Sequence, residues 1–192
     1  MQRSVVVNFI LYQIGWFACV IGAANQMPWL GVAVVFVVVI WHLIQADQPK
    51  RELALLLIVM VIGGTFDQIL LNHQLISYES HGWMNSAQMN HPEMNLIVPV
   101  WILALWAEFV TILNVSLRWM RDRWLIAVLF GAIGGPLAYM GAAKLGAVTL
   151  NMMPASYIAL SVGWAILTPL ILRLSAKFDG FNLMDANLKA EN

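Results

Sequence analysis

Long apolar runs alternate with short polar breaks along the chain. Each run is close to the ~20 residues that an α-helix needs to cross the hydrocarbon core of a bilayer. The breaks, such as DQPKRE at 47–52 and RWMRDR at 118–123, carry the charged and turn-forming residues that end such runs. The pattern predicts an all-α integral membrane protein, a bundle of six transmembrane helices. The predicted spans are residues 5–24, 29–46, 53–72, 97–117, 124–143 and 154–174.

The composition agrees with this class. Hydrophobic residues make up 61% of the 192 residues and charged residues 10%, with a mean hydropathy of +0.76. Soluble domains carry about 25% charged residues. The formal net charge is zero, so the chain has no basic excess of the kind that attracts nucleic acid. The length suits one transmembrane domain, expected at residues 1–174, followed by a polar cytoplasmic tail at 175–192.

Lysine and arginine are distributed unequally between the two predicted sides of the membrane. Nine of the ten fall on one side, and only Lys144 falls on the other. Cytoplasmic loops carry the excess of these residues in membrane proteins. Both termini are therefore predicted to be cytoplasmic, and the long loop at about 73–96 is predicted to be external.

The stretch GAIGGPLAYMGAAK at 131–144 combines small residues with one proline and one lysine. The small residues that share one helix face are Gly131, Gly135, Ala138 and Ala142. Such a face lets helix backbones approach closely in lipid, so we interpret it as a helix-packing surface. A phosphate-binding loop is excluded because no strand precedes the glycines and the Lys-Ser/Thr ending is absent. Pro136 is expected to kink the span.

Polar and ionisable residues inside the predicted spans are the candidates for function. A carboxylate near the bilayer centre costs at least ~2.5 kcal/mol, so Asp67 and Glu108 should face the bundle interior. From Glu108, a polar stripe continues along one side of the fourth span toward the cytoplasm. The stripe fits either interhelical hydrogen bonding or one wall of a polar pocket. The candidate pocket comprises Asp67, Glu108, Thr111, Asn114, Arg118, Tyr139 and Lys144.

Lys144 has two interpretations that the spacing leaves open. Counted from the start of the fifth span, it lies at the outer end, where a lysine can snorkel to the headgroups. Alternatively, it contacts a ligand headgroup or pairs with the carboxylate of Asp67.

The predicted external loop repeats Met-Asn every five residues and contains nearby histidines. Thioether and imidazole groups suit soft metals such as Cu(I), but methionine also packs in apolar loops. Because no tight ligand pair occurs, we predict no metal site and no cofactor. The weak metal candidates are Met84, Met89, Met94, His81 and His91.

Five sequence blocks, taken together in their order, carry a family resemblance. They are NFILYQIGWFACVIGAA, PWLG, FDQILL, WILALWAEFVTILNVSLRW and GAIGGPLAYMGAAKLGAV. The chain resembles a family of bacterial inner-membrane proteins catalogued as domain of unknown function 2878. The resemblance covers most of the membrane-embedded chain, but neither the Met/His loop nor the tail from residue 175. It implies a multi-pass location in the bacterial inner membrane. Genes of the family lie near genes for lipid-modifying enzymes, so the resemblance also implies a role in the chemistry of envelope lipids. It brings no catalytic residues.

Three classes of function fit these observations. The favoured one is binding of, or action on, an envelope lipid or another amphiphile through the intramembrane polar pocket, with membrane lipids as partners. The second is a small proton-coupled transporter, with Asp67 and Glu108 as proton sites. The third is a structural or assembly partner of other membrane proteins, or a homo-oligomer, joined through the small-residue faces. Catalysis is left open, because neither a metal-ligand motif nor a Ser-His pairing is visible.

Overall fold

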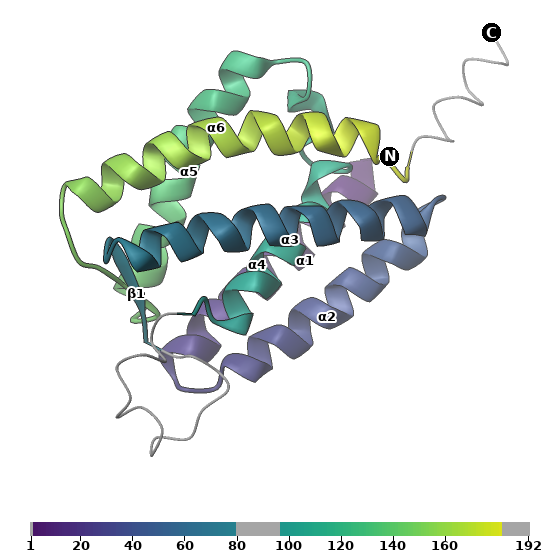
Figure 1. Ribbon diagram of the computed structural model, residues 1–192. Helices are drawn as coiled ribbons and strands as arrows, with labels where there is room; N and C mark the ends of the chain where they lie inside the picture. The colour runs from purple at the N-terminus through teal and green to yellow at the C-terminus, as the bar shows by residue number, and fades with distance from the viewer. Residues whose placement is uncertain (1, 80–96, 182–192) are drawn as a thin grey trace, which may run out of the picture.

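Six α-helices, one short 3-10 helix (Arg118–Met120) and a two-stranded antiparallel sheet form the part of the chain that the computed structural model describes, residues 2–79 and 97–181 (Figure 1). The helices are α1 (Gln2–Ala24), α2 (Pro28–Gln45), α3 (Pro49–Asn72), α4 (Val100–Leu113), α5 (Trp124–Lys144) and α6 (Ala155–Lys177). Five of these helices, all except α4, are long and apolar enough to cross a membrane. The structure therefore supports a helical, multi-pass membrane protein.

Local signals set several helix boundaries. α2 and α3 begin at Pro28 and Pro49, where proline's fixed φ suits the first turn and its missing N–H costs no helix hydrogen bond. α5 ends before Gly146, whose φ of 85° lies in the left-handed region that glycine tolerates. The N–H of Gly146 bonds the carbonyl of Ala143 at 3.0 Å, which completes the turn. Pro136 lies inside α5, which continues through it as one helix.

α4 is shorter than the predicted fourth span and lies inside the bundle. Its 14 residues cover about 21 Å, against ~30 Å of hydrocarbon in a bilayer. Pro99, at φ −65° and ψ 151°, holds extended backbone until the helix begins, and the helix ends before Asn114. Eleven of the 14 residues are buried, against α1, α2 and α3. The predicted span at 97–117 is therefore too long at both ends, and six full-length spans are not established.

A short two-stranded antiparallel sheet, which the apolar pattern did not predict, closes one end of the bundle. β1 (Ile76–Tyr78) follows α3, and β2 (Val148–Leu150) follows α5. Ile76 pairs with Leu150, and Tyr78 pairs with Val148. The pairing joins α3 to α5 at the end of the bundle where both helices finish.

The two ends of the described chain lie together at the opposite end of the bundle, beside the segment between α4 and α5. Ser116 Oγ donates to the carbonyl of Val5 at 3.2 Å, and Arg118 Nη2 donates to Asp179 at 2.6 Å. The assignment of this end to the cytoplasm stays a prediction from the lysine and arginine distribution.

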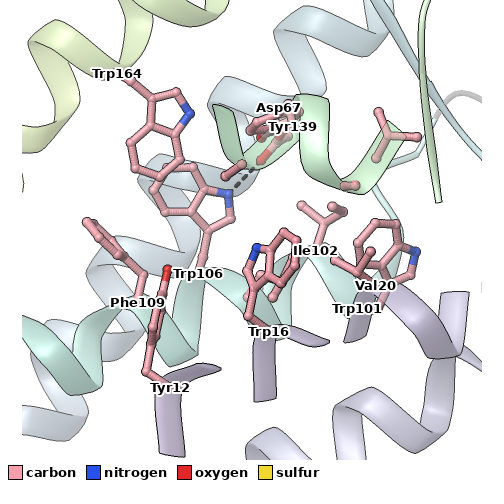
Figure 2. A pocket seen from close by; sticks show the side chains of 14 residues that line it. Tyr12, Trp16, Val20, Asp67, Trp101, Ile102, Trp106, Phe109, Tyr139 and Trp164 are labelled. Carbon is pink, nitrogen blue, oxygen red and sulfur yellow. Dashed lines mark hydrogen bonds between the residues drawn. The ribbon is translucent and has the colours of Figure 1, made fainter. Parts of the chain in front are cut away.

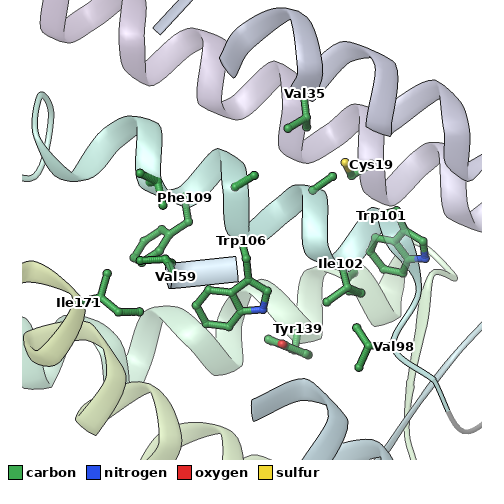
Figure 3. Packing of buried hydrophobic residues seen from close by; sticks show 14 of the residues in the cluster. Cys19, Val35, Val59, Val98, Trp101, Ile102, Trp106, Phe109, Tyr139 and Ile171 are labelled. Carbon is green, nitrogen blue, oxygen red and sulfur yellow. The ribbon is translucent and has the colours of Figure 1, made fainter. Parts of the chain in front are cut away.

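The buried core is built around α4 (Figure 3). Trp101, Trp106 and Phe109 of this helix are nearly or fully buried and pack with side chains of the surrounding helices. Large apolar side chains elsewhere, such as Phe36 and Val61, are exposed on the outer faces. An apolar exterior of this kind is expected where a helix meets lipid.

Candidate functional site

Donors from three elements converge on the carboxylate of Asp67, and Figure 2 shows two of them, Trp106 and Tyr139. Asp67 is fully buried in the last part of α3. Tyr78 OH, from β1, donates to Oδ1 at 2.7 Å, and Trp106 Nε1, from α4, donates to Oδ2 at 2.6 Å. Tyr139 OH, from α5, also donates to Oδ1. One carboxylate therefore connects α3 with α4, α5 and β1.

Close packing between α3 and α4 directs Trp106 toward Asp67. Gly63 lies one turn before Asp67, and a Cβ at Gly63 would be 1.9 Å from the Trp106 ring. Any larger residue there would displace the indole. Trp106 also stacks on Trp164 of α6, with ring centroids 4.8 Å apart and ring planes 9° apart. The glycine and the stacked indole together fix the direction in which Nε1 points.

Tyr78 reaches the cluster from strand β1 rather than from a helix. Burial, and then the charge of Asp67, raise the pKa of Tyr78 well above its usual value of 10.0. The phenol therefore stays protonated and acts as a donor to Asp67 around neutral pH.

A cavity of about 70 Å³ adjoins this cluster between α1, α4, α5 and α6 (Figure 2). The aromatic side chains that line it are Tyr12, Trp16, Trp101, Trp106, Phe109, Tyr139 and Trp164. Aliphatic side chains complete the walls, and among the described residues Asp67 is the one charged group in the lining. The cavity lining is therefore rich in aromatic side chains and carries a single carboxylate among the described residues.

One side of the cavity is not fully closed by protein. Tyr12 and Trp16 of α1, Ala138 of α5 and Trp164 of α6 are half-buried, whereas the lining residues of α3 and β2 are buried. Trp16 approaches α5 at Gly141, where an added Cβ would be 3.4 Å from the indole. The half-buried residues lie in the middle turns of their helices rather than at the ends.

Glu108 occupies a separate buried position on α4. Its two carboxyl oxygens have no hydrogen-bond partner among the described residues. They lie against Gly15 of α1, where a Cβ would be 2.0 Å from both oxygens. Glu108 is fully buried but does not line the cavity. The two intramembrane carboxyl groups, Asp67 and Glu108, therefore have different surroundings.

A second polar cluster binds the C-terminal segment at the other end of the bundle. Asp179 is 2% exposed and accepts hydrogen bonds from Arg118 Nη2 at 2.6 and 2.7 Å and from Arg121 Nη1 at 2.7 Å. The predicted polar tail at 175–192 therefore begins inside α6, which ends at Lys177. The residues that follow the helix dock against the bundle because the Asp179 carboxylate pairs with two guanidinium groups. Residues 182–192 lie outside the described part of the chain.

Glu52 of α3 binds the next residue of this segment, Gly180. Its carboxylate accepts a hydrogen bond from the N–H of Gly180 at 2.7 Å and from Asn114 Nδ2 at 2.5 Å, and it bonds His42 Nε2 at 3.0 Å. The carbonyl of Gly180 accepts from the N–H of Gln48 at 2.9 Å. A Cβ at Gly180 would lie 2.7 Å from Glu52 Cγ, so the fit requires glycine.

Comparison with known proteins identifies a family but no described activity. A family profile with the description "Protein of unknown function (DUF2878)" matches residues 5–170. The chain belongs to this family. The resemblance inferred from the sequence blocks is thus confirmed, and the match includes every residue of the Asp67 cluster and of the cavity lining. Neither the curated proteins nor the solved structures gave a match.

In this DUF2878 protein the predicted pocket residues do not form one pocket. Asp67 and Tyr139 meet directly. Thr111 Oγ1 donates to the carbonyl of Glu108 within its own helix at 2.7 Å. Lys144 is exposed at the C-terminal end of α5.

The predicted polar stripe on the fourth span is divided. α4 ends at Leu113, so Asn114 and Arg118 leave the helical face and join the cluster around Glu52 and Asp179. The stripe thus serves contacts between elements at that end of the bundle rather than one wall of the aromatic cavity.

The small-residue face of α5 has two parts. A Cβ at Gly131 would be 2.1 Å from the carbonyl oxygen of Trp164, and one at Gly135 would be 2.2 Å from the Trp164 ring. These two glycines therefore allow α5 and α6 to pack closely. Ala138 and Ala142, farther along the same face, line the cavity.

Two partners of Asp67 were missing from the predicted pocket. Trp106 carried a signal, because a buried indole N–H usually needs an acceptor. Tyr78 carried none, because its position depends on pairing with a strand far away in the sequence. The methionine and histidine metal candidates at 81–94 lie outside the described residues. The described residues contain no group of three or more His, Cys, Asp or Glu side chains that could hold a metal ion.

Proposed function

We propose that this protein binds a membrane-resident amphiphile in the aromatic cavity between α1, α4, α5 and α6. The observation that carries the proposal is the cavity itself, with aromatic walls, one carboxylate and one side left partly open. Apolar cavities with a few polar groups are the usual form of small-molecule sites.

The size and position of the cavity favour a ligand that is only partly enclosed. Drug-sized ligands occupy pockets of roughly 300–1,000 Å³, whereas this cavity measures about 70 Å³. It can hold one end of a molecule, and the remainder would project past the half-buried side chains of Tyr12 and Ala138. Those side chains lie midway along helices that are long and apolar enough to span a membrane. The projecting part would therefore meet acyl chains, which suits an amphiphile. The bacterial inner membrane, with both termini in the cytoplasm, is the location that we propose for this activity.

The test is to extract and identify small molecules that purify with the protein from its membrane. Ala138→Leu adds three carbons at the cavity wall and should reduce the bound species strongly. Ala143→Leu makes the same change on α5 at a residue that does not line the cavity, and it should retain the wild-type content. Equal amounts of every extracted species in all three proteins would rule out this cavity as the binding site.

Proton-coupled transport is a second candidate, favoured by Glu108. Its carboxyl oxygens are buried on α4 with no hydrogen-bond partner among the described residues, and intramembrane carboxyl groups often carry protons. In vesicles, a pH-driven flux that is lost in Glu108→Gln would support this function. An unaltered flux in that variant would exclude Glu108 as the proton carrier.

A further inference from the structure

We infer that the amphiphile bound in the cavity presents a cationic group, an ammonium on an apolar chain, to Asp67. The inference rests on the proposed function, because it assigns the chemical class of the molecule that the cavity would hold. Its basis is the charge and the aromatic character of the lining.

Asp67 has hydrogen-bond donors but no cationic partner among the described residues. Its three donors are the hydroxyl groups of two tyrosines and one indole N–H. In the part of the chain that the structure describes, the ion pairs involve His42 with Glu52 and the two arginines with Asp179, and none includes Asp67. A buried carboxylate without a countercharge is costly, and a ligand cation would supply that charge.

The hydrogen bonds from the described residues do not use the full acceptor capacity of the carboxylate. A carboxylate offers about four acceptor positions, and three are used here, two on Oδ1 and one on Oδ2. The free position is on Oδ2, the oxygen bonded by Trp106. Because Asp67 lines the cavity, a ligand ammonium or its polarised C–H groups could approach this oxygen.

The aromatic walls favour the same class of ligand. The faces of Trp, Tyr and Phe attract cations electrostatically, and clusters of them recognise quaternary ammonium groups. Seven aromatic residues line this cavity, and four of them are tryptophans, the strongest of the three types. Anionic headgroups are disfavoured, because none of the lining residues is a lysine, arginine or histidine and the one charge present is negative.

The experiment compares two amphiphiles that share a chain and differ in charge. Dodecyltrimethylammonium and dodecyldimethylamine N-oxide, the latter without net charge at neutral pH, are titrated calorimetrically into the protein in a non-ionic detergent. Empty micelles of the same detergent provide the baseline. Asp67→Asn tests the carboxylate, and Glu79→Gln, which removes an exposed carboxylate at the end of β1, is the matched charge control.

The expected result is a preference of about tenfold or more for the cationic amphiphile in wild type and in Glu79→Gln. Asp67→Asn should remove that preference. Equal affinity of the wild type for both amphiphiles would overturn the inference and leave the proposed function intact. Binding of neither above the micelle baseline would count against both. A preference that survives in Asp67→Asn would show that another group selects the charge.

The wild-type comparison decides the cationic class even if Asp67→Asn fails to fold. In that case Ala138→Leu and Ala143→Leu locate the site. Loss of cation binding in the first and retention in the second is expected, whereas equal cation binding in both would place the cation outside the cavity.

Discussion

Replacing Asp179 with asparagine should loosen the C-terminal segment and destabilise the bundle. The change keeps the side-chain shape but removes the charge that Arg118 and Arg121 share. Hydrogen bonds to charged groups contribute about 1.5–3 kcal/mol each, and the three contacts are not additive because they share one carboxylate. The Arg118 side chain is 28% exposed, so water replaces part of the loss. We expect a net cost of about 2–3 kcal/mol.

The single cysteine of the chain provides the assay. Cys19 is fully buried, so a thiol-reactive dye should label it only as the protein unfolds. For a chain of this length, the expected cost lowers the midpoint of thermal unfolding by about 5–10 °C.

Asp122→Asn is the matched control, because Asp122 is exposed in the same segment between α4 and α5 and should change the midpoint by no more than about 2 °C. A shift for Asp179→Asn no larger than the control's would refute the view that this segment is held by its ion pairs.

Three further predictions concern the same fold. Gly131→Ala should destabilise the protein by about 1–3 kcal/mol in the same thermal assay, because the added Cβ would strike a backbone carbonyl of α6. Gly134→Ala is the control: its nearest neighbour would lie at 3.9 Å, so the change should be neutral or stabilising. Equal effects of the two variants would contradict the packing of α5 on α6. Tyr139→Phe should cost about 1–2 kcal/mol, because Asp67 loses a buried donor, and an unchanged midpoint would contradict that bond. The raised pKa of Tyr78 means that the folded state holds the phenol proton more tightly, so its contribution is complete below the unfolded pKa of about 10 and is lost as pH rises above it. Unfolding measured across alkaline pH should show this loss, and Tyr78→Phe should reduce it.

Apolar run length predicted five of the six helices to within a few residues. The reason is that a chain in lipid must satisfy its backbone hydrogen bonds within each segment, so a spanning helix and its apolar run coincide. The fourth run looked the same in composition, yet α4 is short and buried, because Pro99 delays its start and its neighbours cover it. Composition cannot separate a lipid-facing helix from one enclosed by other helices.

The candidate site was predictable only in part. An intramembrane carboxylate must face the interior, which placed Asp67 in a pocket, and Tyr139 was also among the predicted pocket residues. The contribution of Tyr78 arises from strand pairing, and that of Trp106 from its approach to Gly63, and neither contact is local in the sequence. The docking of Asp179 likewise depends on arginines far away in the chain.

The most direct test of the central claim is photo-crosslinking with an amphiphile that carries a diazirine on its acyl chain. The protein in its membrane is irradiated, digested and mapped by mass spectrometry. With the diazirine on the first carbons of the chain, next to the headgroup that the cavity holds, the account predicts labels on cavity-lining residues of three helices, Tyr12, Leu105 and Ala138. It also predicts that Ala138→Leu reduces the labels on the other two. Labels confined to outward-facing side chains such as Phe36 and Val61 would contradict it.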